Sequence, residues 1–160
     1  MEFNNTFTLK QLKLIAYAPA VAANGIAMID GEISEEETMA ISGALLGQSE
    51  KYRHNKLIML AINSFQQFVQ QGDMPGEMRY IKTPEEYLRL FRKIGKTIDK
   101  NVHTEIGKEY KQFLIDLMRQ VATSSINKRR SLFGRGSNVS REEQQFIDHI
   151  ADIMNLEPLS

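Results

Sequence analysis

Apolar residues recur along most of the chain at steps of three and four positions, the spacing that places side chains on one face of an α-helix. The first periodic stretch begins after Thr8, a residue type that caps helix N-termini. Pro19 lies within it and predicts a kink, because proline donates no backbone hydrogen bond and crowds the preceding turn. The apolar positions of this first helix are Leu9, Leu12, Ala16, Ala20, Ala23 and Ala27.

Five further segments share the helical spacing, and none shows the alternation of a β-strand. Ser34 with Glu37, and Thr83 with Glu86, have the spacing of a capping box, in which side chain and backbone satisfy each other at a helix start. We therefore expect an all-α protein that forms a single compact domain of about six helices over residues 1–160. The five further predicted helices are 34–47, 52–70, 84–100, 106–121 and 140–155.

The apolar faces also predict how these helices pack. Helix 52–70 is apolar on more than one face, which indicates contacts on several sides and a central position. A basic, glycine-containing loop is expected at 127–138. The side chains expected in the core are Tyr87, Phe91, Ile94 and Ile98 in the fourth helix, Ile106, Tyr110, Phe113, Leu117 and Val121 in the fifth, and Phe146, Ile147, Ile150 and Met154 in the last.

Composition narrows the class of protein. The chain has no cysteine, which excludes disulfides, thiolate metal sites and cysteine nucleophiles. Residues 14–29 form an uncharged run, but it is shorter than the ~20 apolar residues that a membrane span needs. The first residues show no basic region followed by an apolar one, the pattern of a signal peptide. We expect a soluble cytoplasmic protein without a membrane span.

Charge is balanced overall but unevenly distributed. Residues 1–50 carry seven acidic and two basic side chains, whereas residues 51–140 carry eight acidic and seventeen basic ones. Within helix 84–100, the basic residues lie opposite the apolar face, where they form either a solvated outer face or a surface that docks an acidic partner. The basic loop 127–138 has a single aromatic residue, Phe133, among its basic residues, which is weak evidence for nucleic-acid binding, so no nucleic acid is expected as a partner. The basic residues of helix 84–100 are Arg89, Arg92, Lys93, Lys96 and Lys100.

The acidic stretch "DGEISEEE", residues 30–37, has two interpretations. It fits the second half of a calcium-binding EF-hand loop, with carboxylates at Asp30, Glu32 and Glu37, although the first half of such a loop is missing. This oxygen-rich set favours calcium over zinc as the divalent cation. In the alternative interpretation no metal binds, and Gly31 forms a tight turn while Ser34 and Glu37 cap the following helix.

The same pattern occurs a second time, at the start of the last predicted helix. In "GSNVSREEQQFI", residues 136–147, Ser140 and Glu143 occupy the positions of Ser34 and Glu37. This repeat indicates a pseudo-twofold relation between two helix starts, although two independent capping boxes would give the same pattern. If the repeat brings the two starts together, Glu143 becomes a weaker fourth ligand of the metal site.

An alanine-rich first helix running into "DGEIS", with a later "VSREE" opening a last helix that ends in "IADIMNL", resembles the TerB-like tellurite-resistance family. The resemblance covers both ends of the chain well and the middle only by its helical character. It implies a small all-α fold, a role in tellurite resistance or stress response, and divalent-metal binding through acidic clusters. One departure is Gly136-Ser137 where the first copy has Asp30-Gly31, which weakens any second acidic site.

Evidence for catalysis is sparse in the sequence. The three histidines, His54, His103 and His149, form no helical zinc or di-iron motif, although Glu50 and His54 have the spacing of a surface pair. The chain has neither a phosphate-binding P-loop nor the nucleophile elbow of a hydrolase. We expect a non-catalytic protein that acts by binding a protein partner, with two alternatives. One is a metal-free module that docks an acidic partner through helix 84–100, and the other is an enzyme with an assembled carboxylate–histidine site.

Overall fold

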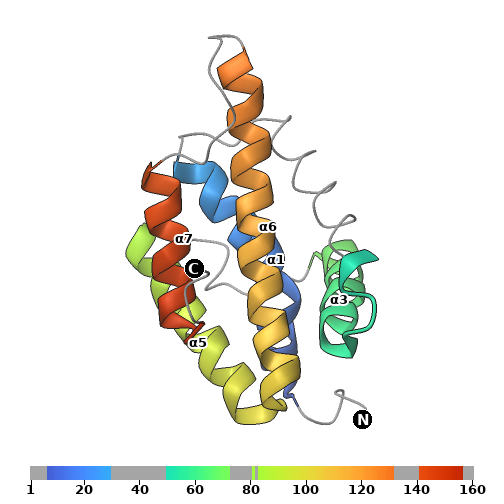
Figure 1. The fold of residues 1–160 in the computed structure, drawn as a ribbon. Helices are drawn as coiled ribbons and strands as arrows, with labels where there is room; N and C mark the ends of the chain where they lie inside the picture. Colours follow the sequence, from blue (N-terminus) through green and yellow to red (C-terminus); the bar gives the residue numbers. More distant parts are fainter. Residues whose placement is uncertain (1–6, 30–49, 73–80, 82, 132–140, 157–160) are drawn as a thin grey trace.

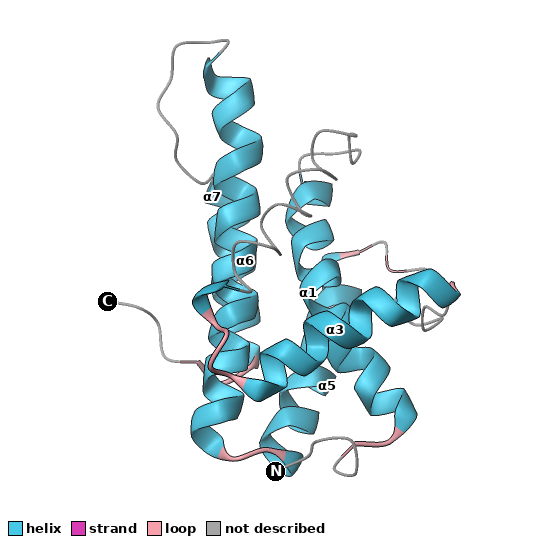
Figure 2. Cartoon of the chain, turned by 90° about the vertical axis from the view of Figure 1, so that its right-hand side faces the viewer, coloured by secondary structure: helices cyan, strands magenta, loops and turns pink. Residues whose placement is uncertain are grey.

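A computed structural model describes residues 7–29, 50–72, 81, 83–131 and 141–156 of the chain. This described part is all-helical and contains no strand, which confirms the predicted all-α class (Figures 1 and 2). The helix expected at 34–47 lies outside the described residues. The described helices are α1 (Leu9–Ile29), α3 (Lys56–Gln71), α5 (Pro84–Asn101), α6 (Thr104–Ser131) and α7 (Arg141–Ile153).

Two long helices, α1 and α6, lie side by side at the centre of the described fold. Helix α3 packs on one flank of this pair, and α5 and α7 pack on the other (Figure 1). The expectation that helix 52–70 is central is therefore wrong, because α1 contacts each of the other described helices. Small side chains explain this, since Ala16, Ala18 and Ala22 are fully buried and allow neighbouring helices to approach α1 from several directions.

The predicted core faces are confirmed in the three later helices. The aromatic and branched side chains of α5, α6 and α7 expected to be buried are buried, with Ile106 partly buried at the edge. Tyr87 of α5 and Phe146 of α7 meet edge to face, with ring centroids 6.0 Å apart. The periodicity of apolar residues therefore located the inward face of these helices correctly.

Side-chain capping sets the observed helix starts. The side chain of Thr8 accepts from the Gln11 N–H, and that of Thr83 accepts from the Glu86 N–H, as the sequence predicts. Helix α3 begins at Lys56 rather than near Tyr52, because Asn55 Oδ1 accepts from the Ile58 N–H and caps the helix there. Helix α6 continues to Ser131, so the first residues of the loop expected at 127–138 are helical.

Pro19 does not end α1, which runs through it without interruption. A proline at this position cannot donate to the carbonyl of Ile15, four residues earlier. The hydroxyl of Tyr110, on α6, donates to that carbonyl instead, at 2.6 Å. Tyr110 is fully buried, and burial raises the pKa of its hydroxyl, so it keeps its proton at neutral pH. The central helix pair is thus joined by a hydrogen bond at the point where α1 lacks one of its own.

Candidate functional site

The residues predicted to hold a metal are only partly described. Asp30, Glu32 and Glu37 lie outside the described residues. Glu143 lies in the first turn of α7, and its side chain is fully buried. In the described ranges, no group of three or more histidine, aspartate and glutamate side chains is placed to hold a metal ion. The divalent-metal site therefore stays a prediction from sequence.

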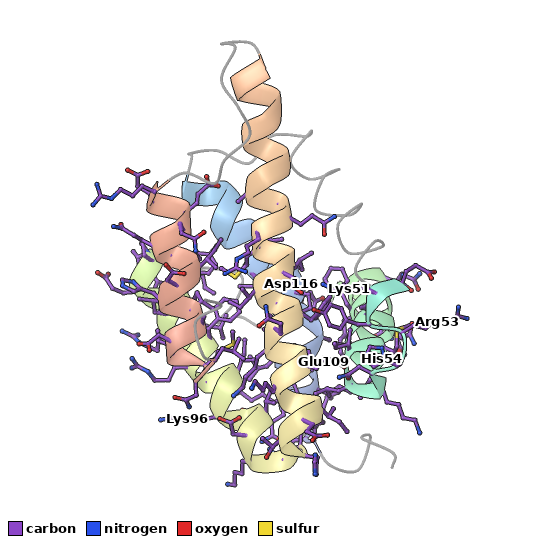
Figure 3. The ribbon with its side chains drawn as sticks, in the orientation of Figure 1. Lys51, Arg53, His54, Lys96, Glu109 and Asp116 are labelled. Carbon is purple, nitrogen blue, oxygen red and sulfur yellow. The ribbon has the colours of Figure 1, made fainter. Side chains whose placement is uncertain are left out.

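A cationic groove runs along the outer face of α5, beside the first turn of α1. Its volume is about 410 Å³. Five of its eight lining residues are basic and none is acidic, so it attracts anions. Figure 3 shows Lys96 of this groove on α5. We call this surface the α5 groove, and its lining residues are Gln11, Arg89, Arg92, Lys93, Lys96, Thr97, Lys100 and Asn101.

The amphipathic pattern of α5 explains why these charges gather. Its basic residues are spaced by three and four positions, so they share one face, while Phe91, Ile94 and Ile98 occupy the opposite face and are fully buried. From Arg89 to Lys100 the helix advances by about 16 Å, at 1.5 Å per residue. Five positive charges are therefore held along one short, rigid element. This arrangement favours an extended anionic ligand over a single small ion.

The cations of the α5 groove are largely available to a ligand. Within the described ranges, no carboxylate forms an ion pair with Arg89, Arg92, Lys96 or Lys100. Asp99 lies on the same helix, but its carboxylate binds the ammonium group of Lys111 on α6 at 2.5 Å. Among the described residues, Asp99 is thus engaged outside the groove.

One neutral side chain of the groove, Gln11, keeps its donor group for a ligand. Gln11 Oε1 accepts from the Thr8 N–H at 2.9 Å, which leaves the amide NH₂ of Gln11 as the group able to donate. Thr97 Oγ1 donates to the Lys93 carbonyl at 2.9 Å, so its hydrogen is already used within the helix. Since arginine and lysine have no acceptor atoms, the groove selects ligands rich in acceptors and negative charge.

A second polar cluster joins the turn before α3 to α6. Asp116 accepts hydrogen bonds from Lys51 at 3.1 Å, from Gln112 at 3.0 Å and from the hydroxyl of Tyr52. Two turns earlier on α6, Glu109 contacts His54 and Asn55, each at 2.8 Å. His54 thus meets a carboxylate from a distant helix (Figure 3).

All four carboxylate oxygens of this cluster are engaged by the described side chains around them. Glu109 Oε1 accepts from Asn55 and Oε2 contacts His54, while both oxygens of Asp116 accept hydrogen bonds. These contacts hold residues 51–55 against α6.

The electrostatics of the cluster agree with a structural role. Burial works to raise the pKa of Asp116, but hydrogen bonds from Tyr52, Gln112 and Lys51, together with the charge of Lys51, outweigh it and lower the pKa. The pKa of Glu109 is also lowered, because hydrogen bonds from His54 and Asn55 and the charge of His54 outweigh its desolvation. Burial and the neighbouring Asp116 raise the pKa of Tyr52, so this phenol stays protonated as a donor.

These pKa shifts predict a loss of stability in acid. A carboxylate with a lowered folded-state pKa stabilises the protein above its unfolded pKa, about 4, and loses this contribution as pH falls through the folded value. We expect Asp116→Ala to lower the free energy of unfolding by ~1–2 kcal/mol at pH 7. Urea unfolding at pH 7 and below pH 3 measures this, and the difference between wild type and variant should shrink at the lower pH. A difference that is equal at both pH values would contradict the assignment.

Comparison with known proteins gives no relative for this chain. No family model, no curated protein and no solved structure matches it. The likeness to the TerB-like family therefore rests on the quoted sequence motifs alone. In the described ranges, no helix has the length and apolar character to cross a bilayer.

Proposed function

We propose that this chain is a non-catalytic binding module that docks an acidic protein partner through the α5 groove. The observation that carries the proposal is the concentration of five basic residues, and no acidic one, in a single hollow on one helix. A stress or tellurite-resistance role rests on the sequence resemblance. Docking an acidic partner is compatible with that role but does not depend on it.

The alternative explanation of the basic residues is a solvated outer face. Charged surfaces on soluble helices usually intersperse both signs, with acidic and basic residues paired at a spacing of four. Helix α5 has Glu85 four residues before Arg89, but from Arg92 to Lys100 its one acidic residue is Asp99, which is bound to Lys111. Like charges at this spacing on a helix repel one another and cost stability. Such a cost is understandable where the surface binds a partner of opposite charge.

The test is a binding measurement with an acidic probe. A fluorescein-labelled oligoglutamate peptide should bind the wild-type protein at low salt and lose affinity as salt increases, because ions screen exposed charges. The double variant Arg92→Glu/Lys96→Glu should weaken binding by about tenfold or more, which corresponds to 1.4 kcal/mol. Fluorescence anisotropy at several salt concentrations measures both effects.

A matched control comes from the other flank of the fold. Arg53 and Lys56 are exposed and lie outside the groove, and Figure 3 shows Arg53 well away from Lys96. The double variant Arg53→Glu/Lys56→Glu changes net charge by the same amount as the groove variant. It should bind the peptide almost as tightly as wild type does. Equal losses in the two variants would mean that net charge, not the groove, binds the probe, and the proposal would be wrong.

A further inference from the structure

The proposed docking function leaves open which acidic group the α5 groove recognises. Carboxylates and phosphoryl groups both supply acceptor oxygens and negative charge, but they differ in the amount of charge that each group carries. A carboxylate carries one charge on two oxygens, whereas a phosphorylated side chain carries between −1.5 and −2 on three oxygens. The arrangement of cations in the groove distinguishes between them.

Two features of the groove favour a phosphoryl group. Arg89 and Arg92 are one turn apart on the same face, and each guanidinium offers a planar fork that pairs with two oxygens of one phosphate. Lys93 and Lys96 follow at once, so four cationic groups occupy two turns of helix. This local positive charge is greater than single carboxylates spaced along a peptide can neutralise.

The length of the groove points to a peptide that carries the phosphoryl group. The basic stretch from Arg89 to Lys100 extends for about 16 Å, which is longer than one phosphoryl group and is spanned by about five residues of extended chain. Lys100, at the far end, is then left for a neighbouring acidic residue of the same peptide. A free phosphate ion would leave this end of the groove unused.

We infer that the α5 groove binds a phosphorylated, acidic segment of a protein partner, with Arg89 and Arg92 holding the phosphoryl group and Lys100 a flanking carboxylate. This inference rests on the proposed docking function and specifies its ligand. No bond is made or broken, so the protein reads the modification and does not introduce it. Gln11, from α1, adds a neutral donor at the side of the groove.

Three peptides that differ at one position test the inference. They share one acidic sequence whose central residue is serine, glutamate or phosphoserine, and each carries fluorescein. The phosphoserine peptide should bind the wild-type protein at least about tenfold more tightly than the glutamate peptide does, a difference of 1.4 kcal/mol. The double variant Arg89→Lys/Arg92→Lys keeps the charge and removes the forks. It should reduce this preference while it still binds the glutamate peptide.

Each of the other outcomes contradicts the phosphoryl ligand, the protein partner or the docking function itself. If wild type binds the glutamate and phosphoserine peptides equally, or if the lysine variant keeps the full preference, the phosphoryl inference is wrong and acidic docking stands. If tripolyphosphate displaces the phosphoserine peptide at equal concentration, or if vesicles containing phosphatidylserine bind in its place, the ligand is not a protein segment. If no acidic peptide binds at low salt, both the inference and the proposed function fail.

Discussion

Replacing Asp99 with alanine should lower the free energy of unfolding by ~2–3 kcal/mol. The side chain of Lys111 is almost completely buried, at 5% exposure, and its ammonium group contacts Asp99 Oδ1 at 2.5 Å and the Met154 carbonyl at 2.7 Å. Breaking a buried ion pair by removing one partner costs 3–5 kcal/mol, because a charge stays buried without compensation. We expect a smaller loss here, since Asp99 is half exposed and water can replace it in part. Urea unfolding followed by circular dichroism measures the change.

The double variant Asp99→Ala/Lys111→Met separates charge burial from a general effect of mutation. Methionine fills the space of the lysine stem without a charge, so the double variant should be more stable than Asp99→Ala alone. Asp152→Ala, at an exposed carboxylate on α7, is the matched control and should change stability by less than about 0.5 kcal/mol. If the loss of unfolding free energy in the double variant equals the sum of the losses in the two single variants, the contribution of Lys111 to stability does not depend on Asp99.

The Lys111 contacts also show what the helix pattern alone does not reveal. Its ammonium group binds a side chain from α5 and a backbone carbonyl just after α7, so one buried lysine joins three helices. Helix α7 ends so that this carbonyl is available, because Asn155 adopts a positive φ of 61° and closes the last turn. Such contacts depend on how helices cross, which no sequence period encodes. The spacing of apolar residues therefore predicts α7 but not its polar link to the core.

Side-chain contacts could be predicted from the sequence where the two residues are close together along the chain. Thr83 and Glu86 are three residues apart, and Thr83 Oγ1 accepts from the Glu86 N–H as the capping-box spacing predicts, whereas Glu86 Oε1 accepts from the Thr83 hydroxyl rather than from its backbone N–H. His54, by contrast, has the spacing of a pair with Glu50 but contacts Glu109, which is 55 residues away in sequence. The basic face of α5 could be predicted because its residues are close together in sequence. The contribution of Gln11 to the same groove could not be predicted, because α1 and α5 meet only in the folded chain.

Replacing Tyr110 with phenylalanine should lower the free energy of unfolding by ~1–3 kcal/mol, the cost of leaving a buried acceptor without a partner. The acceptor is the Ile15 carbonyl, which Pro19 leaves without a donor from its own helix. The loss should therefore depend on the residue at position 19. Alanine there restores a backbone N–H four residues after Ile15, and this N–H can satisfy the carbonyl without the tyrosine.

A double-mutant cycle measures that dependence directly. In the Pro19→Ala background, Tyr110→Phe should cost less than it does in wild type by about 1 kcal/mol or more, since the carbonyl then has a helical donor. An equal cost in both backgrounds would show that the tyrosine hydroxyl stabilises the protein independently of Pro19. The expected coupling would explain why a proline is tolerated inside α1, which contacts each of the other described helices. Helix α6 supplies the hydrogen bond that α1 lacks at the Ile15 carbonyl. This hydrogen bond also joins the two central helices.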